Sequence, residues 1–182
     1  MFPSFIHRAG VLAVCCAALV LPARADDASD INAQFRAGQT AEAFAKLDQL
    51  LQARPKDAQL RFLKGVMLAD SQRGAEATST FLQLTVDYPD LPEPYNNLAV
   101  LYAAQGEYDK ARAALEAALR AQPSYAVAHQ NLGDVYVQLA RRSYAQALQL
   151  DPSGSAALTP KLALLRQLAK PNTTAPAKSA TP

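Results

Sequence analysis

Residues 94–111, PYNNLAVLYAAQGEYDKA, carry the pattern that decides the fold. Tyr95, Leu98 and Tyr102 recur at the i, i+3, i+7 spacing of one face of a helix. Gly106 is expected to end this helix, because glycine readily adopts the left-handed conformation that satisfies the last carbonyls. A second apolar stripe begins directly afterwards, so the stretch predicts a helix, a tight turn and a second helix.

Three sets of residues repeat every 34 positions along the chain. They are prolines (Pro55, Pro89, Pro123), alanines (Ala43, Ala77, Ala111) and bulky apolar residues (Leu47, Phe81, Leu115). Three independent sets with one period predict three copies of the same helix–turn–helix unit. The proline ends the second helix of each unit, because it lacks a backbone N–H. The alanine lets the two helices approach closely, since a larger side chain there would overpack the contact.

A fourth unit departs from this period. Pro152 follows Pro123 by 29 residues rather than 34, and the turn glycine is among the five missing residues. Neither Gly nor Pro occurs between Asp134 and Asp151. We therefore predict one long helix from about Val127 to Leu150, in preference to a tight turn at Leu139–Arg142.

The end of the chain predicts one more helix and a tail. Thr159 is expected to be its N-cap, with Pro160 in the first helical position. Four leucines would cover the exposed end of the stack, as terminal units require: Leu162, Leu164, Leu165 and Leu168. Residues 171–182 contain no bulky apolar side chain, so this tail is expected to be disordered.

The third unit resembles the tetratricopeptide repeat. The residues that fill the pattern of that family are Tyr95, Leu98, Ala99, Tyr102, Gly106, Ala111, Leu115, Ala118 and Pro123. The second unit departs from it, since Arg61 and Lys64 replace the aromatic residue and the leucine. The resemblance covers about residues 28–152. It implies an all-α, right-handed α–α superhelix of about four repeats plus a C-terminal capping helix, and a role in binding proteins.

The first 25 residues have the order of a secretory signal peptide. Arg8 precedes an uncharged apolar run from Ala9 to Leu21, and Ala23 and Ala25 are small residues where a signal peptidase would cleave. A run of 13 residues is too short to cross a bilayer of about 30 Å. We therefore expect a periplasmic or secreted chain with a repeat domain over residues 26–170 and no stable membrane insertion.

The expected exported chain lacks the residues of a catalytic or metal centre. Cys15 and Cys16 both fall in the signal peptide, so no thiolate remains. His129 is then the single histidine, and we interpret it as a packed helix residue. Gly74 and Gly106 are interpreted as turn glycines, because the Lys-Ser/Thr of a phosphate-binding loop is missing. We predict no enzymatic activity, no cofactor and no metal site.

The net charge beyond residue 25 is zero, which argues against a nucleic-acid binder. The charge is nevertheless uneven. Residues 26–140 hold ten basic and fifteen acidic side chains, whereas residues 141–182 hold six basic and one acidic. We favour a polar surface whose charges happen to be divided over the alternative, a basic end that contacts an anionic partner or a membrane surface.

The first helix of each unit is expected to line the concave side of such a stack. The candidate binding residues on it are Phe62, Val66, Asn96, Asn97, Val100, Gln130, Asn131 and Asp134. Asn97 and Asn131 lie one repeat apart, where this repeat family commonly has an asparagine that faces a bound peptide, and an amide can both donate and accept. The alternative is that these two amides only bond to neighbouring helices. Phe62 and Val66 would be apolar anchors.

These features together predict a non-catalytic scaffold that holds a protein or peptide partner in its concave groove. Two alternatives stay open at the level of the sequence. One is a self-associating structural module, since an exposed end of a short stack can pair with a second copy. The other is an accessory subunit of a cell-envelope enzyme.

Overall fold

The computed structural model describes residues 24–169, which form eight α-helices, one short 3-10 helix and no strand. The helices are α1 (Arg24–Arg36), α2 (Thr40–Ala53), α3 (Ala58–Asp70), α4 (Gly74–Asp87), α5 (Pro92–Ala104), α6 (Tyr108–Ala121), α7 (Ala126–Leu150), the 3-10 helix η1 (Pro152–Gly154) and α8 (Ser155–Leu168). Most of the predicted signal peptide and the predicted disordered tail lie outside the described residues.

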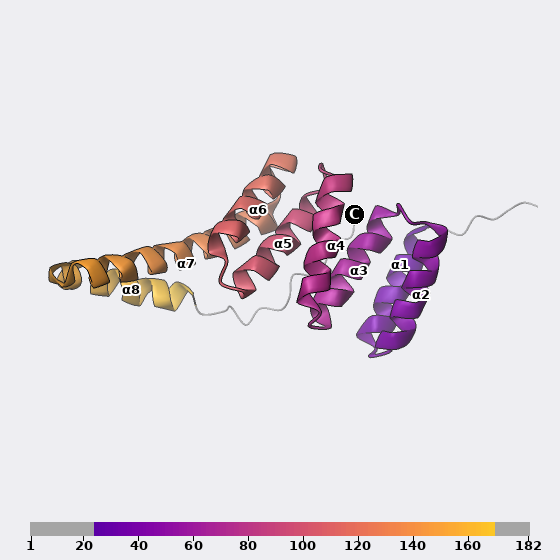
Figure 1. The fold of residues 1–182 in the computed structure, drawn as a ribbon, viewed down its shortest axis with the longest axis horizontal. Helices are drawn as coiled ribbons and strands as arrows, with labels where there is room; N and C mark the ends of the chain where they lie inside the picture. Colours follow the sequence, from indigo (N-terminus) through magenta and orange to yellow (C-terminus); the bar gives the residue numbers. More distant parts are fainter. Residues whose placement is uncertain (1–23, 170–182) are drawn as a thin grey trace, which may run out of the picture.

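The first six helices form three antiparallel pairs that stack side by side (Figure 1). Successive odd-numbered helices contact one another: α1 with α3, α3 with α5, and α5 with α7. Between α2 and α4, and between α4 and α6, no two Cα atoms come within 8 Å. The odd-numbered helices therefore form the tighter, inner layer of a curved stack, and the predicted all-α superhelix is confirmed.

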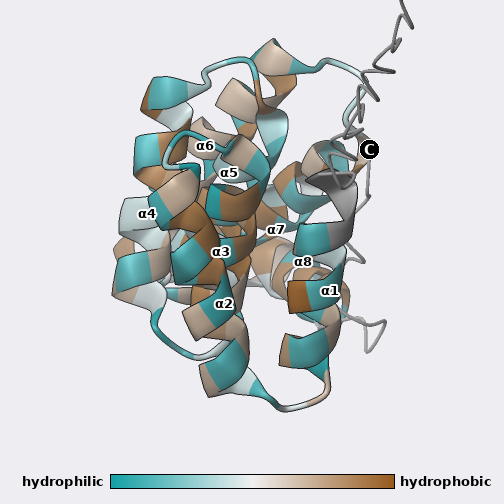
Figure 2. Ribbon diagram, turned by 90° about the vertical axis from the view of Figure 1, so that its right-hand side faces the viewer, coloured by the Kyte–Doolittle hydropathy of each residue, from teal (hydrophilic) through white to brown (hydrophobic). Residues whose placement is uncertain are grey.

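The 34-residue period specifies the core of this stack. All three alanines and all three bulky residues of the period are fully buried: Ala43, Ala77, Ala111, Leu47, Phe81 and Leu115. Figure 2 shows apolar residues where the helices face one another and polar residues on the outward surfaces. Burial of these side chains is the main favourable term, because no single helix of 13 or 14 residues can cover its own apolar stripe.

Charged side chains in the second repeat explain its departure from the family pattern. Arg61 forms an ion pair with Asp87 at 2.6 Å and lies 5.9 Å above the ring of Tyr88. Lys64 donates to Asp48 at 2.7 Å. The two residues therefore connect α3 to both of its neighbours, α2 and α4, by polar contacts where the family pattern has apolar ones.

The three turns within helix pairs share one left-handed residue, again at a spacing of 34. It is Gly38 (φ 85°), Gln72 (φ 60°) and Gly106 (φ 76°). The prediction that Gly74 is a turn glycine is wrong, because Gly74 is the first residue of α4. The period places Gln72 at the left-handed position, where its Cβ crowds the following carbonyl oxygen.

Replacing Gln72 by glycine is expected to raise the free energy of unfolding by about 0.5–1 kcal/mol, because glycine adopts positive φ without that crowding. Urea denaturation followed by circular dichroism measures the change. Gly106→Gln is the matched control and should destabilise by a similar amount. A loss of stability in Gln72→Gly would contradict the turn geometry.

The prediction of one long fourth helix is confirmed, because α7 runs unbroken for 25 residues. Its middle is tied to the start of α6, where Arg142 donates to Asp109 at 2.6 Å. This guanidinium holds the pKa of the Asp109 carboxyl below its usual range. The pair therefore stabilises the fold above the ordinary carboxyl pKa, and this contribution disappears as the pH falls through the lowered one.

The predicted start of the last helix is wrong. α8 begins at Ser155, directly after η1, and Pro160 lies inside it. The Asp151 carboxylate accepts from the Ser153 amide and starts the turn, so the chain is already helical before Pro160. Pro160 then removes one intrahelical hydrogen bond without ending the helix.

The predicted cover of the stack is correct only in part. Leu162 is buried and Leu165 half-buried, whereas Leu164 and Leu168 are exposed. Residues three apart share a helix face, so Leu162 and Leu165 face α7 together while the other two point away from it. The C-terminal half of α7 and α8 thus form a two-helix arm that projects from the stack (Figure 1).

Candidate functional site

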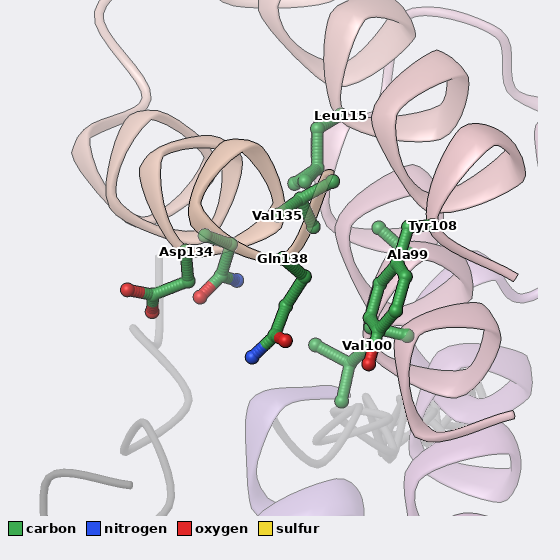
Figure 3. Close-up of a pocket in the computed structure, with 9 residues that line it drawn as sticks. Ala99, Val100, Tyr108, Leu115, Asp134, Val135 and Gln138 are labelled. Atoms are coloured by element: carbon green, nitrogen blue, oxygen red, sulfur yellow. The ribbon is translucent and has the colours of Figure 1, made fainter. Parts of the chain in front are cut away.

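A hollow of about 260 Å³ opens between α5, α6 and α7. Nine residues line it: Ala99, Val100, Ala103, Tyr108, Leu115, Asn131, Asp134, Val135 and Gln138. All of them except Tyr108 and Leu115 come from α5 and α7 of the inner layer, and Figure 3 shows how the side chains are arranged. The hollow is therefore mainly a feature of the inner layer.

The hollow has an apolar floor and a mixed rim. Ala99, Leu115 and Val135 are buried at its base. Val100 is 51% exposed and stands at the rim, although it is an apolar side chain. Gln138 extends from α7 toward the side on which Val100 lies, whereas Asp134 points outward (Figure 3). The surface therefore offers one apolar contact beside an amide that can donate and accept.

The asparagines of the inner layer already bond within the chain. The Asn131 amide nitrogen donates to Asn96 Oδ1 at 2.8 Å, which joins α7 to α5. The Asn97 amide nitrogen donates to the Glu93 carbonyl one turn earlier, at 2.9 Å. Asn131 thus makes the interhelical bond of the alternative interpretation, and Asn97 bonds within its own helix. Contact with a peptide stays a prediction for both.

The hydrogen bond between Asn131 and Asn96 also stabilises the fold. Asn96 is only 6% exposed, so removing its partner leaves a nearly buried polar group unsatisfied. A substitution of Asn131 would therefore disturb the packing of α7 on α5 in addition to any binding. Val100 is the cleaner probe of this surface, because its side chain is half exposed and makes no polar contact.

The structure gathers three of the eight predicted binding residues at the hollow: Val100, Asn131 and Asp134. Phe62 is half-buried instead, with its ring 5.6 Å from that of Phe81, and Val66 packs in the same cluster. Asn96, Asn97 and the exposed Gln130 lie on α5 and α7 outside the lining. The two predicted apolar anchors therefore contribute mainly to the core.

Sequence reasoning missed Tyr108 and Gln138. Tyr108 begins the second helix of its unit, which the repeat pattern predicts to lie in the outer layer. Gln138 could have been found, since Asn131, Asp134 and Gln138 follow the i, i+3, i+7 spacing of one helix face.

His129 is exposed, and its Nε2 lies 2.9 Å from the Pro123 carbonyl oxygen. The interpretation of His129 as a packed residue is therefore wrong: this face of α7 has no helix against it. Among residues 24–169, no group of three or more His, Cys, Asp or Glu side chains could hold a metal ion. None of the described helices combines the length and the apolar character that a membrane span needs.

Three sequence models of the tetratricopeptide repeat match the chain, at residues 31–92, 80–113 and 101–139. Together with the stacked helix pairs, these matches decide the family. The chain belongs to the tetratricopeptide repeat family. The fold of this family is generally a non-catalytic scaffold for protein interactions.

A curated relative is the tetratricopeptide repeat domain-containing protein PYG7, chloroplastic, of Arabidopsis thaliana. It is 35% identical over 91 residues, which make up 44% of this chain and 30% of that protein. The matched part thus spans less than a third of the relative's length, and the likeness concerns the repeats alone.

Solved structures of other tetratricopeptide repeat proteins share the architecture. TTC0263 of Thermus thermophilus superposes with a TM-score of 0.58 at 21% identity, over 80% of this chain and 82% of that one. PilF of Pseudomonas aeruginosa gives a TM-score of 0.58 at 18% identity, over 80% and 68%. At these identities the likeness shows the fold.

Proposed function

We propose that this tetratricopeptide repeat protein is an exported scaffold that binds an extended segment of a partner protein along its inner layer. The observation that carries the proposal is the hollow between α5 and α7, with Val100 at its rim. An exposed valine beside side-chain amides suits a peptide, whose backbone needs donors and acceptors and whose side chains need apolar contact.

The absence of basic side chains among the residues that line the hollow favours a neutral polypeptide as the partner. Asp134 is the one ionisable carboxylate that lines the hollow, and none of the lining residues is Lys or Arg. A site for phosphate groups or a terminal carboxylate would need basic side chains. A neutral segment of polypeptide therefore fits the hollow better than a nucleic acid or an anionic peptide.

A photo-crosslinking residue at Val100 is expected to form an adduct with a partner protein in the producing cells. Val86 is the matched control, because it is also an exposed valine, at 73%, but lies on α4 of the outer layer. The molecular mass of adducts on a denaturing gel, followed by mass spectrometry, gives the result. Equal adducts from both positions, or none from Val100, would refute binding at the inner layer.

Export is supported by the order of charge, apolar run and small residues in the first 25 positions. We expect the mature protein to begin at Asp26 and to reside in the periplasm or outside the cell. Mass spectrometry of the N-terminal peptide from producing cells tests this expectation, and a predominant species that retains residues 1–25 would contradict it.

A further inference from the structure

One face of α7 is bare, although the equivalent face of α5 is covered. The residues of α7 that follow Ala99 and Tyr102 of α5 by 34 positions are Gly133 and Tyr136, and they form this face. Their neighbour Leu132 is half-buried in the cluster between α5, α6 and α7. Ala99 is 1% exposed. Gly133 is exposed, and a Cβ built on it would meet nothing within 4 Å, while Tyr136 is 49% exposed.

The third repeat shows which element normally covers this face of the first helix. On α5 the cover is α6, through the buried residues Ala111, Leu115 and Ala118. The counterparts of these residues, 29 positions later, are Ala140, Tyr144 and Ala147. They lie in the C-terminal half of α7, in the same unbroken helix as the face that they should cover.

A straight helix cannot fold back on itself. The five residues missing from this repeat would have formed the turn, and without them the covering half of α7 extends away from the stack (Figure 1). At about 1.5 Å per residue, α7 is about 37 Å long, so its two halves stay apart. Each chain therefore has both an uncovered face and the segment that fits it, and cannot combine the two.

We propose that two copies of this chain exchange these segments. The arm of each copy (residues 140–168) packs on the bare face of the partner's α7 and takes the place that a second helix holds in the other repeats. The two α7 helices then run antiparallel about a two-fold axis, and each stack is completed by the other chain. Exchange of an identical element is a low-cost route to a dimer, favoured where a hinge is short.

A stripe along α7, exposed except at the half-buried Ala140 and Ala147, has the geometry that such a contact needs. Spacings of four and three residues alternate along it, as on one face of a long helix pair: His129, Gly133, Tyr136, Ala140, Ser143, Ala147 and Leu150. Leu150 is 77% exposed at the end of this stripe. In an antiparallel hairpin, residues at equal distances from the turn face each other. In the hairpin of α5 and α6, the midpoint lies between Ala104 and Tyr108. The counterparts of these two residues in α7 are Gln138 and Val137, so the two-fold axis passes near them.

The charges favour a second copy over other occupants. Residues 26–140 carry a net charge of −5, from ten basic and fifteen acidic side chains. The described remainder, residues 141–169, carries +3, from Arg141, Arg142, Lys161 and Arg166 against Asp151. The exchange brings the basic arm of one chain to the acidic stack of the other, and this attraction acts in both directions. The inference is independent of what the inner layer binds.

Restoring the turn tests the proposal. A second copy of residues 106–110 (Gly-Glu-Tyr-Asp-Lys), inserted between Leu139 and Ala140, returns Pro152 to the 34-residue period. We expect the natural chain to be a dimer by light scattering and the insertion variant to be a monomer with the same helix content by circular dichroism. A natural chain that is monomeric at about 100 µM would overturn the proposal, as would a variant that stays dimeric.

A disulfide at the two-fold axis identifies the contact itself. In the full chain with Cys15→Ser and Cys16→Ser, Tyr136→Cys should form a covalent dimer on mild oxidation, because residue 136 lies within two residues of the two-fold axis and its two copies come close together. Gln149→Cys, exposed on another face of α7, is the control and should form little dimer. Equal disulfide formation at both positions, or a monomeric chain that binds anionic lipid vesicles through the arm, would overturn the exchange.

Discussion

Replacing Phe81 by alanine is expected to lower the free energy of unfolding by about 3–5 kcal/mol, the usual cost of deleting a buried aromatic side chain. Phe81 is fully buried in the middle of the stack, where its ring lies 5.6 Å from the ring of Phe62. It belongs to the cluster that joins α3, α4 and α5. Domains of this size are stable by only about 5–15 kcal/mol, so the loss is a large fraction of the total.

Urea denaturation followed by circular dichroism measures this loss. The control on the same helix is Val86→Ala, because Val86 is exposed and its removal should change stability by less than about 0.5 kcal/mol. If Phe81→Ala and Val86→Ala destabilised the chain equally, the 34-residue period would not describe the core.

Replacing Gly65 by alanine is expected to destabilise the chain by about 1–3 kcal/mol through overpacking. A Cβ on Gly65 would lie 2.6 Å from Phe81 Cε1 and 2.7 Å from Cζ, closer than carbon atoms can approach. The clash outweighs the gain of about 1 kcal/mol that alanine normally brings to a helix interior. Since Phe81 causes the clash, Gly65→Ala should cost less in a Phe81→Leu background, and a double-mutant cycle measures the difference.

Gly133→Ala is the matched control, because Gly133 is also a helical glycine, and a Cβ there would meet no atom of its own chain within 4 Å. In the exchanged dimer, alanine would match Ala99 at the equivalent position of α5. Here alanine should raise the free energy of unfolding by about 0.5–1 kcal/mol. A stabilising Gly65→Ala would show that α3 and α4 do not pack through Phe81.

The period of 34 residues predicted most of the fold, because a repeat is one physical solution used several times. A buried alanine and a buried bulky residue recur where each pair of helices crosses, so one unit was enough to place the others. The turn of the second repeat escaped this reasoning. Gln72 holds a conformation typical of glycine, and only its distance from Gly38 and Gly106 identifies it.

The C-terminal arm was harder to predict, because local signals disagree there. Pro160 usually marks a helix start, but Asp151 and the turn after it begin the helix earlier. Their apolar character alone predicts Leu164 and Leu168 as covering residues. Which leucines face α7 depends on where α8 begins. It also depends on the fourth repeat, which has no turn that would fold its second helix back onto the first.

The candidate site could be predicted only coarsely. The sequence indicated which helices line the inner layer, but the side chains there divide between core and surface in ways that depend on tertiary packing. Phe62 packs in the core beside Phe81, and Asn131 bonds to the nearly buried Asn96. Residue type alone cannot distinguish an asparagine that bonds two helices together from one whose amide is free to bind a peptide.

The odd-numbered helices form a continuous inner layer, whereas the backbones of successive even-numbered helices lie farther apart. Nuclear Overhauser contacts between assigned protons in solution test this arrangement most directly. We predict contacts from α1 to α3, from α3 to α5 and from α5 to α7, including one between the amides of Asn96 and Asn131. Overhauser contacts between backbone protons of α2 and α4, or of α4 and α6, in place of these would contradict this arrangement.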